Sequence, residues 1–174
     1  MHLNFLPIRM FRETPQVTFF DAGVRTSNGC DVVIHNGSAI SPPNDVENEQ
    51  YYVHQNQIDH NLVLEGNRKF TLLNPSWDEP HHVIFLKRDM GALQIPIGTY
   101  HRSVSGKKGS IVINQSIRKK GFDPDKEFLP VNLRVRKDLM YAKSIKPIFW
   151  VYENNEIKRI ELSPLELKAS QKFY

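Results

Sequence analysis

The sequence predicts an all-β protein built as a sandwich or a barrel. Short runs rich in Val, Ile, Phe and Tyr recur along the chain, and 9 glycines and 11 prolines separate them at short intervals. Many short strands with turn residues between them are typical of these two architectures. In chain order, the predicted strands are Val17–Phe20, Asp31–His35, Gln50–His54, His60–Glu65, Arg68–Leu73, His82–Lys87, Ala92–Pro96, Ser110–Ser116, Val131–Arg136 and Ile148–Tyr152.

Two of the predicted strands are apolar on both faces. Leu62-Val63-Leu64 and Val83-Ile84-Phe85-Leu86 do not alternate between apolar and polar residues. Strands of this kind are buried on both sides, so a further layer must cover the outer face of the sheet. The partner subunit of a homodimer and the chain's own termini would serve equally well, and we expect a homodimer.

Turn residues and one helix signal complete the outline. Glu65-Gly66-Asn67 interrupts an apolar run and fits a tight hairpin. Asn154-Asn155 fits the turn of a C-terminal hairpin between Ile148–Tyr152 and Ile157–Leu162. A short helix is predicted at about residues 164–171, because Ser163 can cap it and Pro164 suits its first position.

The composition favours one globular domain. With 174 residues, 40% of them hydrophobic, the chain can bury an ordinary core. The polar segment 119–127 divides a barrel at residues 1–120 from an extension at 121–174 that packs on the barrel or on a partner subunit. No run approaches the roughly 20 apolar residues of a membrane span, and the first residues carry no secretory signal. A single cysteine, Cys30, excludes an internal disulfide, so we expect a cytoplasmic protein.

The charge pattern does not indicate nucleic-acid binding. The net charge is +4, and the basic clusters Lys107-Lys108 and Arg118-Lys119-Lys120 are small and lie outside any helical basic stripe. We predict neither a nucleic acid nor a membrane as a partner, and expect attraction for anionic small molecules at most. Arg68, Lys69 and Arg102 could meet an anionic substrate, but exposed surface charge is the default interpretation for all three.

Two segments bear histidines beside turns. Side chains at i and i+2 of a strand share a face, so Tyr52 and His54 point the same way, and Asp59 and Asn61 share a face after the turn. A hairpin here would bring His54 close to Asp59. His101 follows the turn Pro96-x-Gly98, and folding one hairpin over the other would bring it to the same place. Two imidazoles and one carboxylate in a barrel resemble a metal-binding facial triad.

These segments resemble the two motifs of the cupin superfamily, which implies a double-stranded β-helix, or jelly-roll barrel. The first motif, G-x5-H-x-H-x3,4-E-x6-G, is matched by Tyr52-x-His54-x4-Asp59-x6-Gly66. The second, G-x5-P-x-G-x2-H-x3-N, is matched by Gly91-x4-Pro96-x-Gly98-x2-His101-x3-Ser105, with one residue missing. The leading glycine is Val46 here, Tyr52 stands at the first histidine position, and Asp59 and Ser105 replace glutamate and asparagine.

The resemblance implies the residues of the site. In metal-binding cupins the motif histidines and glutamate hold the ion, which leaves His54, Asp59 and His101 as metal ligands if a divalent transition metal binds. The chain resembles the dTDP-4-dehydrorhamnose 3,5-epimerases and sugar ketoisomerases more closely. This resemblance is carried by residues 53–59, Gly66 and Ile95-Pro96-x-Gly98-x2-His101. Those enzymes generally need no metal, and use a histidine as base and a tyrosine as acid.

A sugar or sugar-nucleotide epimerase or isomerase is therefore the leading hypothesis. Neutral imidazole can take a proton at physiological pH, and a neighbouring carboxylate raises its basicity. We expect His54 to be the base and Asp59 its orienting partner, with Tyr100 or Tyr52 as the acid. The substrate, sugar-like or anionic, is expected to contact these side chains: Tyr52, Gln57, Asn61, His101 and Arg102. The alternatives are a metal-dependent oxygenase or lyase, and a non-catalytic ligand-binding or assembly protein.

Other residues are given ordinary structural roles. His60 is expected at the surface or in an interface, because it points away from Asp59. Cys30 is expected to be a buried thiol. Trp77 is either a lid over the pocket or loop packing, and Phe149-Trp150 is expected in the core.

Overall fold

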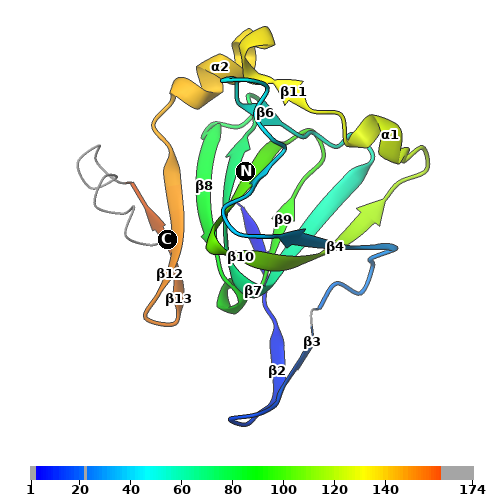
Figure 1. The fold of residues 1–174 in the computed structure, drawn as a ribbon, viewed down its shortest axis with the longest axis vertical. Helices are drawn as coiled ribbons and strands as arrows, with labels where there is room; N and C mark the ends of the chain where they lie inside the picture. Colours follow the sequence, from blue (N-terminus) through cyan, green and yellow to red (C-terminus); the bar gives the residue numbers. More distant parts are fainter. Residues whose placement is uncertain (1–2, 22, 162–174) are drawn as a thin grey trace.

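A nine-stranded sheet that curls round on itself forms the body of the protein (Figure 1). The computed structural model describes residues 3–21 and 23–161, so the predicted helix at 164–171 lies outside the described residues. The strands of this sheet are β1 (Asn4–Leu6), β4 (Gly29–His35), β5 (Ile40–Ser41), β7 (Gln57–Leu73), β8 (His81–Leu86), β9 (Ala92–Ile95), β10 (Tyr100–Arg118), β12 (Ile148–Glu153) and β13 (Glu156–Ile160). The all-β jelly-roll prediction is confirmed.

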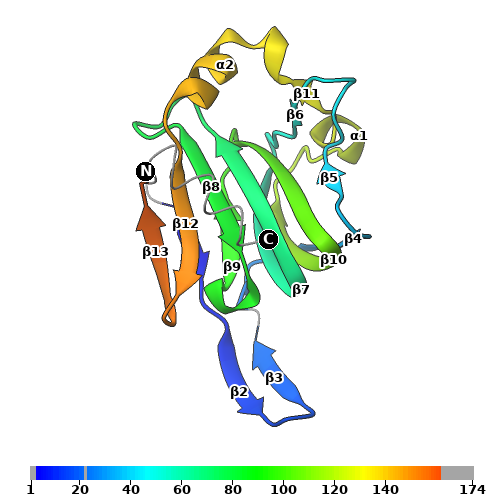
Figure 2. The ribbon, with the colours of Figure 1, turned by 60° about the vertical axis from the view of Figure 1, so that its left-hand side comes forward.

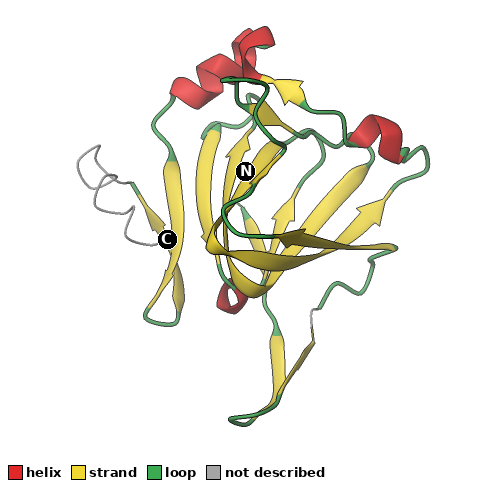
Figure 3. Cartoon of the chain, in the orientation of Figure 1, coloured by secondary structure: helices red, strands yellow, loops and turns green. Residues whose placement is uncertain are grey.

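Smaller elements surround the sheet. The strands β2 (Arg9–Glu13) and β3 (Thr18–Asp21) pair as a separate hairpin, and β6 (Gln50–Tyr51) pairs with β11 (Val131–Asn132). The helices are α1 (Pro124–Glu127) and α2 (Lys137–Ser144), with 3-10 turns η1 (Arg88–Met90) and η2 (Leu133–Val135). Figure 3 shows α1 and α2 at one end of the barrel and the β2–β3 hairpin projecting from the other.

Two long strands give the barrel its shape. β7 and β10 pair along most of their lengths, while the other edge of β7 pairs first with β9 and then with β8 (Figure 2). Both strands bend at a corner where Gly66 and Gly109 meet, each with positive φ. A Cβ on Gly66 would lie 2.5 Å from the Gly109 carbonyl oxygen, so only glycine fits this approach. The predicted hairpin at Glu65-Gly66-Asn67 is therefore wrong, because these residues bend one continuous strand.

The barrel interior is apolar away from the cavity. The main core consists of inward-facing side chains of the sheet together with Met90 of η1, all at most 4% exposed: Val63, Phe70, Leu72, Ile84, Leu86, Met90, Leu93, Ile95 and Val112. Phe5 of β1 and Trp150 of β12 pack against this core, with ring centroids 5.7 Å apart. β1, near the start of the described chain, and β12, near its end, therefore cover the same side of the core.

The outer layer comes from this chain itself. Leu139 and Ala142 of α2 pack on Tyr51, Leu73 and Tyr100, which face outward from the sheet. On β8, the ring of Phe85 stacks on Phe149 of β12 at a centroid distance of 6.3 Å. Because β12 is the strand next to β8 in the same sheet, this contact extends the sheet sideways and does not cover its outer face, so the cover expected over Val83–Leu86 stays a prediction.

The C-terminal hairpin is confirmed and one helix was missed. β12 pairs with β13, and both turn residues, Asn154 and Asn155, have positive φ, as a tight hairpin turn requires. The predicted strand at Val131–Arg136 ends after two residues, and α2 follows it. Helical spacing places Leu139 and Ala142 of α2 on the buried side, but the pattern is weak because Met140 and Tyr141 between them are exposed.

The division into a barrel at 1–120 and an extension at 121–174 stays a prediction, although β12 lies parallel to β8 in the same sheet. Among the described residues, no helix combines the length and the apolar composition needed to cross a bilayer.

Candidate functional site

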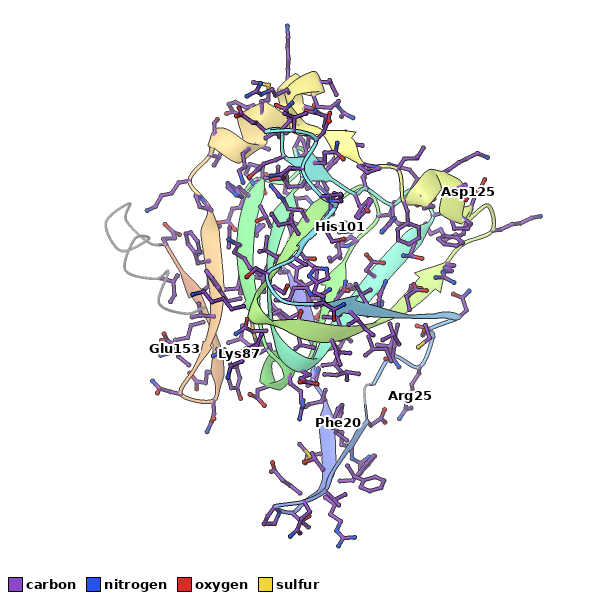
Figure 4. All side chains as sticks on the ribbon, viewed as in Figure 1. Phe20, Arg25, Lys87, His101, Asp125 and Glu153 are labelled. Atoms are coloured by element: carbon purple, nitrogen blue, oxygen red, sulfur yellow. The ribbon has the colours of Figure 1, made fainter. Side chains whose placement is uncertain are left out.

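A cavity of about 250 Å³ opens at one end of the curled sheet. Side chains from both halves of β7 and from β10 line it, together with residues of β4, of β5, of the loop after β6 and of the segment after α1. The lining residues are Val33, Ser41, Tyr52, His54, Asp59, Asn61, Arg68, Phe70, His101, Ser103, Asn114 and Phe128. His101, labelled in Figure 4, lies within the curl of the sheet. The cavity therefore combines polar groups with aromatic walls, as small-molecule sites do.

Asp59 is the fixed point of the site. It is 3% exposed, and its Oδ1 accepts hydrogen bonds from Gln57 Nε2 at 2.7 Å and from Asn114 Nδ2 at 2.9 Å. Gln57 in turn accepts a hydrogen bond from Arg118 Nε at 2.9 Å, and Arg118 pairs with Asp31. These bonds hold one carboxylate oxygen in place and leave Oδ2 directed at the two imidazoles.

His54 and His101 share that oxygen. The distances to Asp59 Oδ2 are 3.4 Å from His54 Nε2 and 3.7 Å from His101 Nε2, and the two rings lie 4.9 Å apart. The predicted convergence of these three side chains is therefore present. The three side chains do not meet through the predicted hairpin. β6 pairs with β11 and not with β7, and His54 lies in the loop that connects β6 to β7.

Backbone carbonyl groups determine which nitrogen of each imidazole carries a hydrogen. His54 Nδ1 lies 3.0 Å from the Glu127 carbonyl oxygen, and His101 Nδ1 lies 3.2 Å from the Thr99 carbonyl oxygen. A carbonyl only accepts hydrogen bonds, so Nδ1 carries a hydrogen in both rings. The proton that distinguishes neutral imidazole from imidazolium is therefore the one on Nε2, beside Asp59.

The environment pushes the two imidazoles toward different charge states. Burial disfavours the His54 cation, but Asp59 and Glu127 outweigh it and raise the pKa of His54 above its ordinary value. Burial lowers the pKa of His101 to about 4, against the attraction of Asp59. Burial also disfavours charge on Asp59, yet contact with both imidazoles lowers the pKa of Asp59. The pKa values of the two imidazoles are therefore shifted in opposite directions: His54 is the ring that binds a proton more readily, and His101 is neutral at neutral pH.

A segment far along the chain closes the mouth. Glu127, at the end of α1, accepts hydrogen bonds from the backbone N–H groups of Gln55 at 2.7 Å and Asn56 at 3.0 Å. Phe128 packs edge-on against His54, with ring centroids 5.0 Å apart, and against Tyr52 at 6.1 Å. No motif pointed to Glu127 or Phe128, because their contact with residues 52–56 depends on the tertiary fold.

Three predicted substrate or catalytic residues lie elsewhere. Tyr100 faces the outer layer, where its hydroxyl accepts a hydrogen bond from Arg136 at 2.6 Å. Arg102 is 6% exposed and pairs with Glu49 at 2.8 Å, also outside the cavity. Gln57 supports Asp59 and does not line the cavity. Tyr100 and Arg102 flank His101, so strand alternation alone places them on the opposite face.

Tyr52 and Asn61 line the cavity as expected, and Asn114, Ser103 and Arg68 join them. Polar residues at every second position of β10 gave a usable signal for this inner face, and it was missed. Arg68 is 2% exposed, so its expected place at the surface is wrong.

Four minor predictions are corrected or resolved. His60 is 2% exposed, with its Nδ1 3.0 Å from the Gln115 carbonyl oxygen, so it is not at the surface. Cys30 is exposed and not buried. Trp77 packs on His82 and does not line the cavity, which makes it loop packing. Phe149 is in the core, as predicted.

The architecture is that of the RmlC-like cupins. The chain is similar to QdtA, a sugar 3,4-ketoisomerase from Thermoanaerobacterium thermosaccharolyticum solved with TDP. The TM-score is 0.56 at 11% identity, over 81% of this chain and 94% of that one. It is also similar to a dTDP-4-dehydrorhamnose 3,5-epimerase from Elizabethkingia anophelis, with a TM-score of 0.53 at 10% identity, over 79% and 84% of the two chains.

A third similar structure is the rmlC epimerase of Mycobacterium tuberculosis, with a TM-score of 0.53 at 9% identity, over 80% of this chain and 76% of that one. No protein-family profile matches the sequence, and no curated protein matches it. At these identities the likeness establishes the fold.

Proposed function

We propose that this protein moves protons at a carbon next to the carbonyl group of a small sugar, as sugar epimerases and ketoisomerases do. One observation carries the proposal: two imidazoles share a single buried carboxylate on the wall of one cavity, and their pKa values are shifted in opposite directions. Environments that push two titratable groups apart assign a base and an acid. The epimerases and the ketoisomerase among the similar structures support the same kind of reaction.

In this proposal His101 is the base, in place of His54. Its Nδ1 hydrogen is held by Thr99, which leaves the Nε2 lone pair free to take a proton from the substrate carbon. The electron pair of the broken C–H bond moves onto the carbonyl oxygen and gives an enolate. Asp59 stabilises the imidazolium that forms on His101. The His54 cation and the Tyr52 hydroxyl are the groups that can donate a proton to the enolate oxygen.

The test is hydrogen exchange in D2O. A similar structure, from Legionella pneumophila, holds dTDP-4-keto-L-rhamnose, which serves as a probe together with the neutral ketosugar D-fructose. We expect loss of the ¹H NMR signal next to the carbonyl, and a rate about 100-fold or more lower in His101→Gln. The same loss in His54→Ala, with full activity in His101→Gln, would return the role of base to His54. The reaction would be contradicted if the folded wild-type protein exchanged neither of these probes and neither of two anionic ketosugars, 5-keto-D-gluconate and D-fructose 6-phosphate.

A divalent transition metal is the second candidate, since the donor set fits one. Both rings hold their Nδ1 hydrogens on carbonyls, so Nε2 of each can face an ion together with Asp59 Oδ2, and these ligand atoms lie within 4.8 Å of one another. When bound, such an ion would polarise a substrate oxygen. Elemental analysis of protein purified without chelator, run beside the exchange assay, separates the two candidates. Binding of sugars without exchange would favour a non-catalytic ligand-binding role.

We also propose that a second copy of the chain covers the β2–β3 hairpin and the outer face of β4. Phe11 and Phe19 on the hairpin are 58% and 59% exposed, and Val32 and Ile34 on β4 are each 60% exposed. Within the described part of the chain, the far edge of β4 has no strand partner. The double change Phe11→Ser and Phe19→Ser is expected to convert a dimer to a monomer in sedimentation velocity. A wild-type monomer at micromolar concentration would contradict this. Cytoplasmic location stays a prediction.

A further inference from the structure

An arginine without a charged partner lies in the wall of the cavity. Arg68 is 2% exposed and lines the same space as His54, Asp59 and His101. Its Nε donates to Ser110 Oγ at 3.0 Å, and its Nη2 donates to the carbonyl oxygens of Ser110 and Val33 at 3.2 and 3.3 Å. Among residues 3–21 and 23–161, no carboxylate forms an ion pair with it, and its Nη1 makes no hydrogen bond.

A buried cation without a counter-charge is costly to the fold. Removing a guanidinium from water costs several kcal/mol unless an anion compensates for the lost hydration. Burial lowers the pKa of Arg68 to about 10, so the group stays charged at neutral pH. His35, nearby, supplies no counter-charge, because an imidazole is either neutral or positively charged; burial and Arg68 lower its pKa to about 4. Such a charge is expected where a ligand supplies the missing anion.

The remaining walls are compatible with an anion. The other polar lining residues, Ser41, Asn61, Ser103 and Asn114, are neutral hydrogen-bonding groups. Asp59 is the only carboxylate among the lining residues, and its Oδ2 already contacts His54 Nε2 at 3.4 Å. The cavity, at about 250 Å³, lies below the roughly 300–1,000 Å³ of pockets for drug-sized ligands. It therefore suits a single sugar ring better than a complete sugar nucleotide.

We infer that Arg68 binds an oxyanion, a carboxylate or a phosphate, carried by the sugar itself, with the reacting carbon at the histidines. The substrate class is then a keto sugar acid or a sugar phosphate. Arginine suits both groups, because its planar fork of N–H donors matches their oxygens. The inference rests on the proposed function for the reaction at the histidines, but the anion site itself can be tested without any turnover.

The test compares three ligands of similar size by isothermal titration calorimetry: D-fructose, 5-keto-D-gluconate and D-fructose 6-phosphate. We expect the wild-type protein to bind at least one of the two anions about 10-fold or more tightly than fructose, and the tighter of the two identifies the oxyanion. In Arg68→Gln this preference should disappear, whereas Arg68→Lys should keep part of it. Lys108→Gln removes an equal charge from an exposed position and should keep all of it.

Two outcomes would overturn the inference. Equal affinity of the wild-type protein for all three ligands does so even if the Arg68 variants fail to fold. A preference for the anion that persists in folded Arg68→Gln does so as well. The preference for the anion in binding and the exchange reaction can fail separately. His101→Gln should still bind the anion more tightly than fructose. A wild-type protein that keeps this preference but catalyses no exchange would refute the proposed reaction and leave the anion site standing.

Discussion

Replacing Asp59 by asparagine is expected to lower the rate of hydrogen exchange by about 10²–10⁴-fold, the range that a general acid–base system contributes. Asp59 Oδ2 contacts both imidazoles, so in the proposed reaction its charge favours the protonated form of His54 and stabilises the cation that forms on His101. Asparagine preserves the shape and the contacts with neighbouring side chains but removes that charge. The measurement is the loss of the ¹H signal of the substrate in D2O, with folding checked by circular dichroism.

A second readout separates this role from a merely structural one. Because Asp59 raises the pKa of His54 against the effect of burial, the pKa of His54 should fall in Asp59→Asn. NMR titration of the ring C–H signals measures this directly. Asp45→Asn, which changes an exposed aspartate, is the matched control and should alter neither quantity. Unchanged exchange in Asp59→Asn would remove the carboxylate from the reaction.

The second large effect is expected on stability in mild acid. His35 and His81 are 8% and 5% exposed, and burial is the main cause that lowers the pKa of each to about 4. His81 illustrates the reason: its Nδ1 lies 3.0 Å from the Ile145 carbonyl oxygen, and its Nε2 is buried without a hydrogen-bond partner in the described structure. A second proton would therefore create a buried, unpaired N–H and charge.

The direction follows from linkage. Between pH 6.5 and pH 4 the unfolded chain binds protons that the folded chain does not, so stability falls as the pH falls through this window. Each such histidine is expected to cost about 2 kcal/mol on going from pH 7.5 to pH 5. His54 acts in the opposite direction, because its raised pKa adds stability that is present at low pH and is lost as the pH rises through it.

Comparison with a variant isolates the contribution of one histidine. Glutamine at position 81 can keep a hydrogen bond to Ile145 and does not titrate, so His81→Gln should lose about 2 kcal/mol less than the wild type between pH 7.5 and pH 5. Urea unfolding at the two pH values gives the free energies. Lys108→Gln should behave as the wild type. An identical loss in His81→Gln and the wild type would show that this imidazole is not held neutral.

Local patterns in the sequence predict much of the fold and part of the site. Turn residues such as Asn154-Asn155 and the alternation of side chains placed strands correctly, and the two motifs brought His54, Asp59 and His101 together. Gly66 was misinterpreted because a turn and a sharp bend need the same positive φ. Whether the chain reverses there depends on β10 beside it, which local sequence does not reveal.

The rest of the site depends on contacts between distant residues. Arg68 is a charged residue in a strand, and burial of its side chain follows from the closure of the barrel. Glu127 lies in a polar segment that looks like a solvated connection, yet its carboxylate binds the backbone at residues 55 and 56. The position of Tyr100, in contrast, could be predicted from local sequence, because neighbouring residues of a strand point to opposite faces and His101 points inward.

The bond between His54 and the Glu127 carbonyl spans 73 residues of chain, and it has a consequence for the order of assembly. On the ribosome, the loop that carries His54 is made long before the residues that orient its ring. The nascent chain can thus curl its sheet before it gains a competent reaction centre, and chemistry becomes available only when synthesis has passed α1.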